Sequence, residues 1–455
     1  MAKKIRKKRE KHVVGPKEMI FDVVSILAIV LFIGFIGFRS IKYYSKERAK
    51  NKVEANTLFR AITTDNKITK GETGLRQTED GYYFIGNVEN NYVKAFNRLY
   101  RIVDINKNNE IKIVSNGNEA VFTYGDDNGY LTSNVYNWLN KVDNVPSGVY
   151  YNTIPGVEKL LTKTSYKIAT FDNNKIEYKD KKNYKDYFSI LSISDYTRAL
   201  GTKSYLKNGS FSFILGDDVN GNPLYLTEDG TVDVASSYDG YGVRVVMTLK
   251  KNILINGGKG TIDDPYILNQ EDNDNEVNKY FKLGDDVYQA VQQVDNILRL
   301  KKTDFAMING SYLEVPFSNY SSEFDYNERN NIANYLNSAY LNSLPYAGNL
   351  VDCELYTGEI SSDTSYSMSE IFTNMVYYKV GLLNQFDLNT DSNLTDYYLI
   401  NKTSSVGNML KTYNKMGILD DEKGNTIKKI VPVICIDKNI FKNGNGSLDN
   451  PYVME

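Results

Sequence analysis

The chain has 455 residues, enough for two or three domains, and its formal net charge is −2. This small value conceals a split, because residues 1–60 hold 15 Lys+Arg against 5 Asp+Glu, while the remainder holds 39 against 51. An acidic body lacks the basic face that nucleic-acid binding needs, so we expect no nucleic-acid partner.

The histidine content argues against several enzyme classes. The single histidine, His12, lies in the basic head. The body therefore has no imidazole for Ser-His-Asp or Cys-His catalysis, and none for a His-ligated zinc site. We predict a protein that is not an enzyme and that holds no cofactor or metal.

Residues 19–38, MIFDVVSILAIVLFIGFIGF, form an apolar run with one charge, Asp22. At ~1.5 Å per residue, a helix of this length spans the ~30 Å hydrocarbon core of a membrane. No small-residue cleavage site follows the run, which argues against a cleaved signal peptide. Residues 1–18 carry the denser positive charge. We therefore predict a single-pass protein of the cell membrane. Its head, residues 1–18, would be cytoplasmic, residues 19–38 would contact lipid, and the body would be extracellular.

Residues 39–62 lack Pro and Gly and favour a helix, whereas 63–78 are polar. We expect 39–78 to be a helical stalk and linker. From residue 79 the chain becomes rich in strand patterns, such as the segments 99–106 and 111–114 on either side of the turn KNNE. Residues 131–140 have helical apolar spacing that places Trp138 in a core.

Two stretches of the body repeat one phrase. Residues 242–268, GVRVVMTLKKNILINGGKGTIDDPYIL, match residues 429–455, KIVPVICIDKNIFKNGNGSLDNPYVME. A repeat of this kind sets the architecture, and each copy has an apolar β-rich run, a Gly-rich turn and a short closing strand. We predict two tandem α+β modules, 79–270 and 276–455, each mixed but mostly antiparallel and each ending in this hairpin.

The first module resembles a family of bacterial surface domains of unknown function that is common in Bacilli and gut Firmicutes. The resemblance rests on YYFIGNVENNYVKAF, LYRIVDIN, NVYNWLN with YYNTIP, SILSISDYTRALG and the closing phrase. It covers nearly all of 79–268 and implies a fold similar to that of C-type lectins and formylglycine-generating enzymes. Val245 stands where family members often have Pro, and the second copy has Val431 at the position of Arg244.

Four residues are candidate ligand contacts. Arg244 belongs to the repeated phrase, although a structural ion pair is the alternative role for it. Asp218, Asn220 and Asp229 resemble part of a calcium loop, but Pro223 replaces the glycine at its sixth position and the twelfth residue is not Glu. A polar turn between two strands explains the same pattern.

The only cysteines, Cys353 and Cys435, both lie in the second module. They form either a disulfide, which closes a long loop, or two buried thiols that pack as small apolar side chains.

These features together favour a non-catalytic, membrane-anchored binding or adhesion protein of the cell surface that recognises an extracellular glycan or protein. Two alternatives remain. One is a structural component of envelope assembly. The other is a hydrolase that acts through two carboxylates, which would need a pocket with two close acids.

Overall fold

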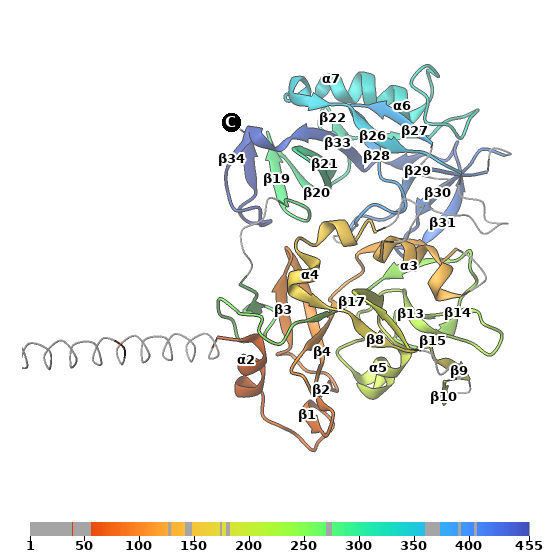
Figure 1. Ribbon diagram of the computed structural model, residues 1–455. Helices are drawn as coiled ribbons and strands as arrows, with labels where there is room; N and C mark the ends of the chain where they lie inside the picture. The colour runs from red at the N-terminus through yellow and green to blue at the C-terminus, as the bar shows by residue number, and fades with distance from the viewer. Residues whose placement is uncertain are drawn as a thin grey trace, which may run out of the picture. The chain divides into compact units, whose positions relative to one another are not determined.

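The computed structural model describes Arg39 and residues 56–454, except for 126–128, 142–147, 173–174, 179–182, 270–274, 360–373, 390–392 and 405–406. The chain divides into two compact units, Met1–Asn56 and Thr57–Glu455. All the helices and strands of Figure 1 that carry labels belong to the second unit.

Strands dominate this unit. They hold 41% of the described residues and helices hold 14%, so the expected α+β class is wrong and the fold is mainly β. The physical reason is that most apolar runs are short and are separated by Gly, Asn and Asp turns, which suits strands of two to nine residues better than helices.

The predicted membrane helix needs correction as well. Residues 19–38 lie outside the described residues, and in the part of the chain that is described no helix is long and apolar enough to cross a membrane. The structure therefore does not support a single-pass membrane protein with an extracellular body, and that localisation is withdrawn.

From Thr57 onwards, the segment expected to be stalk and linker belongs to the second unit. Helix α2, Leu58–Asp65, buries Leu58 and Ile62 completely, and the side chain of the preceding Thr57 caps it by accepting from the Arg60 amide. Strand β1, Gly74–Thr78, pairs with β2, Gly81–Ile85. Both elements thus pack on the first module.

Besides β2, the first module contains the strands β3 to β18. They are β3 Tyr92–Ala95, β4 Arg98–Asn106, β5 Ile111–Ser115, β6 Ala120–Thr123, β7 Leu161–Thr162, β8 Thr164–Tyr166, β9 Thr170–Asp172, β10 Lys175–Glu177, β11 Tyr184–Asp186, β12 Phe188–Ile190, β13 Ser212–Asp217, β14 Pro223–Leu226, β15 Val232–Val234, β16 Gly240–Val243, β17 Val245–Leu249 and β18 Tyr266–Ile267. Its α-helices are α3 Asn134–Leu139, α4 Val157–Leu160 and α5 Ile193–Arg198.

The second module has its own strands. They are β19 Tyr280–Leu283, β20 Asp286–Val294, β21 Ile297–Lys302, β22 Met307–Ile308, β23 Ser311–Tyr312, β24 Glu314–Val315, β25 Leu350–Val351, β26 Cys353–Tyr356, β27 Met375–Tyr378, β28 Val380–Leu382, β29 Tyr397–Ser404, β30 Met409–Tyr413, β31 Leu419–Lys423, β32 Lys428–Lys429, β33 Pro432–Asp437, β34 Phe441–Asn443 and β35 Tyr452–Met454. Its α-helices are α6 Ile332–Tyr335 and α7 Leu341–Ser343, with the π-helical turn η4 Leu336–Tyr340 between them.

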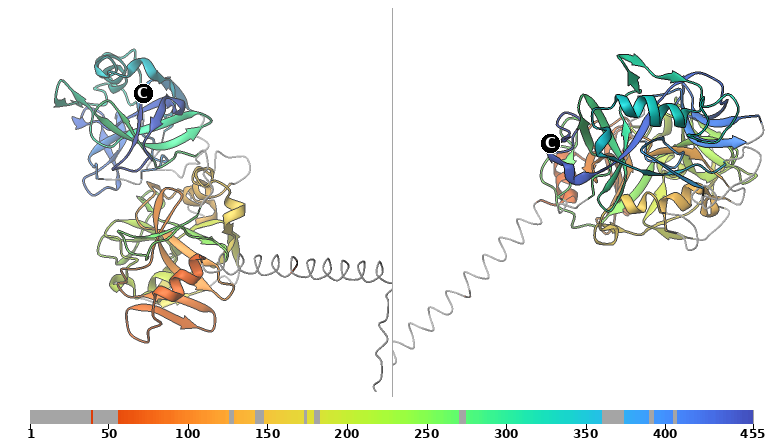
Figure 2. Two further views of the ribbon diagram at one scale, coloured as in Figure 1. Left: turned by 90° about the vertical axis from the view of Figure 1, so that its left-hand side faces the viewer. Right: turned by 90° about the horizontal axis from the view of Figure 1, so that it is seen from above.

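The main sheets of the two modules share one topology. The first runs β18-β3-β4-β5-β17, with β7 and β12 both paired to β17. The second runs β35-β19-β20-β21-β33, with β25 and β28 both paired to β33. Within the described ranges no strand of one set pairs with a strand of the other, and Figures 1 and 2 show the two sets as separate groups.

Helix-to-strand contacts repeat as well. The Asn140 side chain donates to the Phe188 carbonyl at 3.1 Å, and Asn337 donates to Val380 at 2.8 Å. Phe188 and Val380 begin β12 and β28, the equivalent strands. The correspondence between the two modules therefore extends from the sheets to individual side chains.

The Gly-rich part of the repeated phrase has a steric cause. Gly258 and Gly444 have φ values of +99° and +103°, and a Cβ at either would lie 1.9 or 2.1 Å from the carbonyl oxygen of Pro265 or Pro451. Only glycine fits such a position, because it has no Cβ and tolerates positive φ. The closing strand then lies parallel to β3 or β19.

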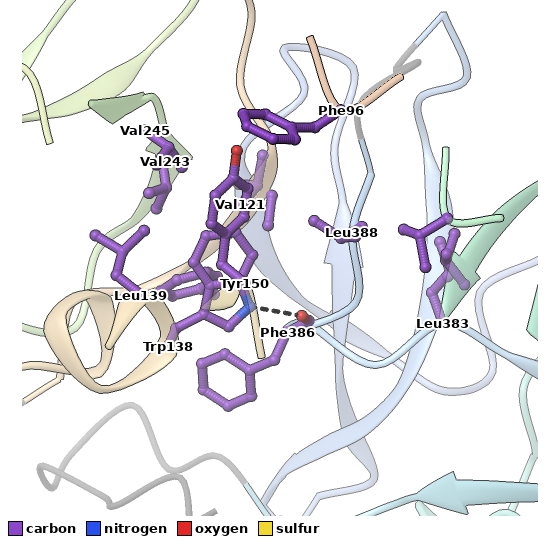
Figure 3. Close-up of a cluster of buried hydrophobic side chains, with 14 of the residues drawn as sticks. Phe96, Val121, Trp138, Leu139, Tyr150, Val243, Val245, Leu383, Phe386 and Leu388 are labelled. Carbon is purple, nitrogen blue, oxygen red and sulfur yellow. Dashed lines mark hydrogen bonds between the residues drawn. The ribbon is translucent and has the colours of Figure 1, made fainter. Parts of the chain in front are cut away.

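The two modules share an apolar interface. The centre of the Phe122 ring lies 4.9 Å from that of Phe386 and 5.3 Å from that of the Trp138 indole. Trp138 is fully buried. Figure 3 shows Trp138 and Phe386 together with Tyr150 and Leu388. The Tyr413 hydroxyl, from β30, also donates to the Val121 carbonyl of β6 at 3.1 Å.

Candidate functional site

A polar cavity of about 310 Å³ lies where residues of the two modules meet. We call it the Arg98–Glu119 cavity. Its lining residues are Asn97, Arg98, Leu99, Asn116, Gly117, Asn118, Glu119, Asn278, Tyr280 and Gln289. Most of these side chains are amides or charged groups, so the cavity offers hydrogen bonds rather than apolar contact.

The ion pair of Arg98 with Glu119 is the electrostatic centre of the cavity. The Arg98 Nε lies 2.9 Å from Glu119 Oε2, and only 2% and 4% of the two side chains are exposed. Arg98 also donates to the Thr153 hydroxyl at 3.0 Å, and its guanidinium lies 4.9 Å from the centre of the Tyr150 ring. The Tyr100 hydroxyl interacts with the same guanidinium, so buried neighbours surround the Arg98 charge.

Burial controls the protonation of the acid. It raises the pKa of the Glu119 carboxyl to about 7, and the neighbouring Arg98 offsets only part of that rise. Glu119 therefore changes charge near neutral pH. A group of this kind in a cavity is a candidate functional residue.

The turn that carries Asn97 to the cavity is strained. Phe96 and Asn97 connect β3 to β4 and have φ values of +50° and +59°. Phenylalanine rarely adopts this conformation, which costs on the order of 1–3 kcal/mol. Burial of the Phe96 ring, with its centre 6.4 Å from that of Tyr100, offsets the strain. The equivalent turn of the second module uses Gly284 instead.

The amide side chains that line the cavity make some of the hydrogen bonds of which they are capable. Asn118 donates to the Phe211 carbonyl at 3.0 Å, while its Oδ1 lacks a hydrogen-bond partner within the described residues. The Gln289 amide donates to Asn278 at 3.3 Å, and Asn97 donates to the Val277 carbonyl at 3.2 Å. Amides from both modules thus line one space.

A second cavity, of about 250 Å³, adjoins the first through Thr153. Its buried ion pair joins Arg299 of β21 to Asp387. Burial raises the pKa of Asp387, which Arg299 and the Asn384 backbone amide oppose. Arg299 also donates to the Glu354 carbonyl at 3.2 Å.

Arg244, predicted as a ligand contact, lies elsewhere and is 1% exposed. Its guanidinium donates to the Ser115 carbonyl at 3.1 and 3.2 Å and to the Leu206 carbonyl at 2.5 Å. Burial lowers the pKa of Arg244 to about 10. The residue ties the end of β5 to the chain around Leu206, and no ion pair of the described residues includes it.

The predicted acidic candidates do not meet. Asp218 lies in the turn between β13 and β14 and accepts from the backbone amides of Asn220 and Asn222, both at 2.8 Å. Asp229 lies beyond the other end of β14 and accepts from the Thr231 amide at 2.9 Å. Among the described residues, no three His, Cys, Asp or Glu side chains are grouped to hold a metal ion.

The two cysteines are joined. Cys353, in β26, forms a disulfide with Cys435, in β33, and the Cα atoms are 5.3 Å apart. Of the two alternatives left open by the sequence, the structure has the disulfide. It links the central strand β33 to the β26–β27 hairpin of the same module.

Sequence reasoning missed Arg98 and Glu119. The signal for Arg98 was present, because Arg98, Tyr100 and Ile102 alternate on one face of β4 and all three are buried. A charged residue on an apolar strand face requires a partner. That partner, Glu119, comes from the loop after β5, and periodicity gives no indication of it.

The chain matches no protein-family model, no curated protein and no solved structure. The resemblance to bacterial surface domains therefore stays a prediction.

Proposed function

We propose that the protein is a non-catalytic binding protein that takes a glycan in the Arg98–Glu119 cavity. The observation that carries this proposal is the amide-rich lining around one buried ion pair. Hydroxyl groups of a sugar both donate and accept, so they match amide side chains that do the same. A volume of about 310 Å³ is at the small end of the range for ligand sites, ~300–1,000 Å³.

The lining argues against the hydrolase alternative. Hydrolysis of a glycosidic bond generally needs two carboxyl groups on either side of the bond. Glu119 is the one carboxylic acid among the residues that line this cavity, and it is already paired with Arg98. The same lining supports reversible binding, in which the ligand leaves unchanged.

A glycan array probed with the full chain tests the proposal, followed by titration of the best glycan. Asn118→Ala removes an amide of the lining, and Asn97→Gly removes another while keeping the positive φ of the turn. We expect each to weaken binding by roughly tenfold, the effect of losing one hydrogen bond of about 1.4 kcal/mol.

Asn256→Ala serves as the control, because Asn256 is exposed and lies outside the cavity. Equal affinity of all three variants, or no selective glycan, would contradict the proposal. Selective capture of a protein through the same residues would instead favour a protein ligand. Absence of any ligand would favour the structural role in envelope assembly.

A further inference from the structure

The end of the main sheet where β17 and β33 finish is built alike in the two modules but is more basic in the first than in the second. Leu249 pairs with Ile111 and Leu161 in the first module, and Ile436 pairs with Leu298 and Leu350 in the second. The next residue is Lys250 in the first module and Asp437 in the second. The repeat thus provides an internal comparison of two surfaces on one scaffold.

In the first module this end forms an open groove of about 790 Å³. Four lysines line it, and we call it the lysine groove: Lys107, Lys159, Lys250 and Lys251. They come from three segments, namely the β4–β5 turn, helix α4 and the chain after β17. In the described part of the chain, no ion pair involves any of the four.

The one acidic side chain of the groove is occupied by neighbours. Glu110 accepts from the Asn106 amide at 2.8 Å and from the Thr162 hydroxyl at 3.1 Å. Lys250 Nζ donates to the Glu158 backbone carbonyl at 2.5 Å, which holds it at the surface without neutralising it. The groove therefore keeps an excess of positive charge on a body whose overall charge is negative.

The corresponding end of the second module has a smaller cavity, of about 240 Å³. It is lined by Asp295 from the β20–β21 turn and by Asp352 and Glu354 beside β25, with Arg299 as the single cation. Arg299 is paired with Asp387. The lining of this cavity is therefore mostly acidic and would repel the ligand that the lysine groove attracts, although Lys438 stands at the position of Lys251.

We propose that the lysine groove, whose lining has no aromatic side chain on which a nucleic-acid base could stack, binds a flexible polymer other than nucleic acid that carries phosphate groups along its length. Lysine ammonium groups are compact charges suited to phosphate oxygens. Lys107, Lys159 and Lys251 are exposed, so each alone gives a weak, screened attraction, and a single phosphate ion would not be retained. A chain of phosphates contacts several lysines at once and gains from each. This site is separate from the Arg98–Glu119 cavity and does not depend on the function proposed for it.

Lysine labelling of the full chain by an amine-reactive reagent, read by mass spectrometry, tests the proposal site by site. Linear inorganic polyphosphate is the probe, and orthophosphate at equal total phosphate is the second arm. We expect polyphosphate to protect the four groove lysines and orthophosphate to protect none. Lys438, which occupies the position of Lys251 in the second copy, is the matched control and should label as before.

The salt dependence provides a second measurement. Four phosphate contacts predict an affinity that falls roughly 50-fold between 50 and 200 mM salt. A variant with all four lysines changed to Gln should lose the part of the polyphosphate affinity that the groove supplies, whereas Lys438→Gln should keep it. Protection confined to lysines of residues 1–60, or equal protection of Lys438, would overturn the proposal. Protection by orthophosphate would overturn the polymer requirement.

Discussion

The indole Nε1 of Trp138 donates a hydrogen bond to the backbone carbonyl of Phe386 at 2.9 Å, across 248 positions of sequence. Trp138 lies in helix α3 of the first module, and Phe386 follows β28 of the second. The bond is dashed in Figure 3. Beside it, the Asn389 backbone amide donates to the Glu119 carbonyl at 2.9 Å. One loop of the second module is thereby fixed against the first module and against the candidate site.

Replacing Phe386 by Ala tests this interface. The change removes a ring that is 1% exposed and should cost about 3–5 kcal/mol of unfolding free energy. Trp138 is the only tryptophan, so its fluorescence reports the interface directly, and we expect its emission to move to longer wavelength. Tyr320→Ala, at a residue that is 80% exposed, is the control. An unchanged emission maximum would show that the interface does not depend on Phe386.

Glu119 should make stability depend on pH. Its pKa is about 7 in the folded protein and ordinarily 4.5, so between these values the folded state binds more protons than the unfolded state. Stability should therefore fall as pH rises from about 4.5 to 7, by about 3 kcal/mol in total. Denaturant unfolding of the wild type and Glu119→Gln across this range measures the effect.

The two curves should agree most closely near pH 5, where Glu119 is neutral like Gln, and should separate towards pH 8. Asp387 contributes to both proteins alike and drops out of the difference. Glu158→Gln, at an exposed carboxylate, is the matched control. Parallel curves for the wild type and Glu119→Gln would show that Glu119 does not titrate in this window.

The repeated phrase predicts paired effects of glycine substitution. Gly258→Ala and Gly444→Ala should each cost at least ~1–3 kcal/mol, because the new Cβ meets a proline carbonyl and φ is positive. Gly348→Ala, with no atom within 4 Å of the Cβ position, is the control. Thermal unfolding of the three variants checks this. Tolerance at Gly258 combined with loss at Gly444 would mean that the loops are not energetically equivalent.

The disulfide should stabilise the second module. Cys353 and Cys435 are separated by 82 positions, and closing a loop of this size contributes about 2–4 kcal/mol. Reducing agent should lower the melting temperature of the wild type. The variant with both cysteines changed to Ser should melt at the lower temperature with or without reductant. A wild type that is insensitive to reductant even when unfolded would contradict the bond.

Local patterns predicted some elements well. The strands expected at 99–106 and 111–114 are β4 and β5, paired through Asp104 and Lys112, and the helix expected at 131–140 contains α3 with Trp138 fully buried. The repeated ending is the closing hairpin that was expected, with β34 antiparallel to β35. These features depend on short-range alternation, turn residues and apolar spacing, all of which a sequence displays.

The candidate site could not be predicted in the same way. Arg98 begins β4 and Glu119 lies in the loop after β5, while Gln289 of the other module lines the same cavity. Arg244 was expected at a ligand site because it belongs to a distinctive phrase, but its donors are used by the Ser115 and Leu206 carbonyls. A sequence shows which residues are charged, whereas packing over long separations decides which of them pair.

An early strand of each main sheet lies beside the closing strand: Val93 faces Tyr266 in one module, and Phe281 faces Tyr452 in the other. A chain segment that begins and ends with paired strands can be copied in tandem by a single in-frame gene duplication, because the new copy carries both partners of its own closing contact. Each copy can then diverge in surface charge, as Lys250 and Asp437 have, while that closing contact stays within the copy. The short closing strand is thus the feature that makes this module a heritable building block.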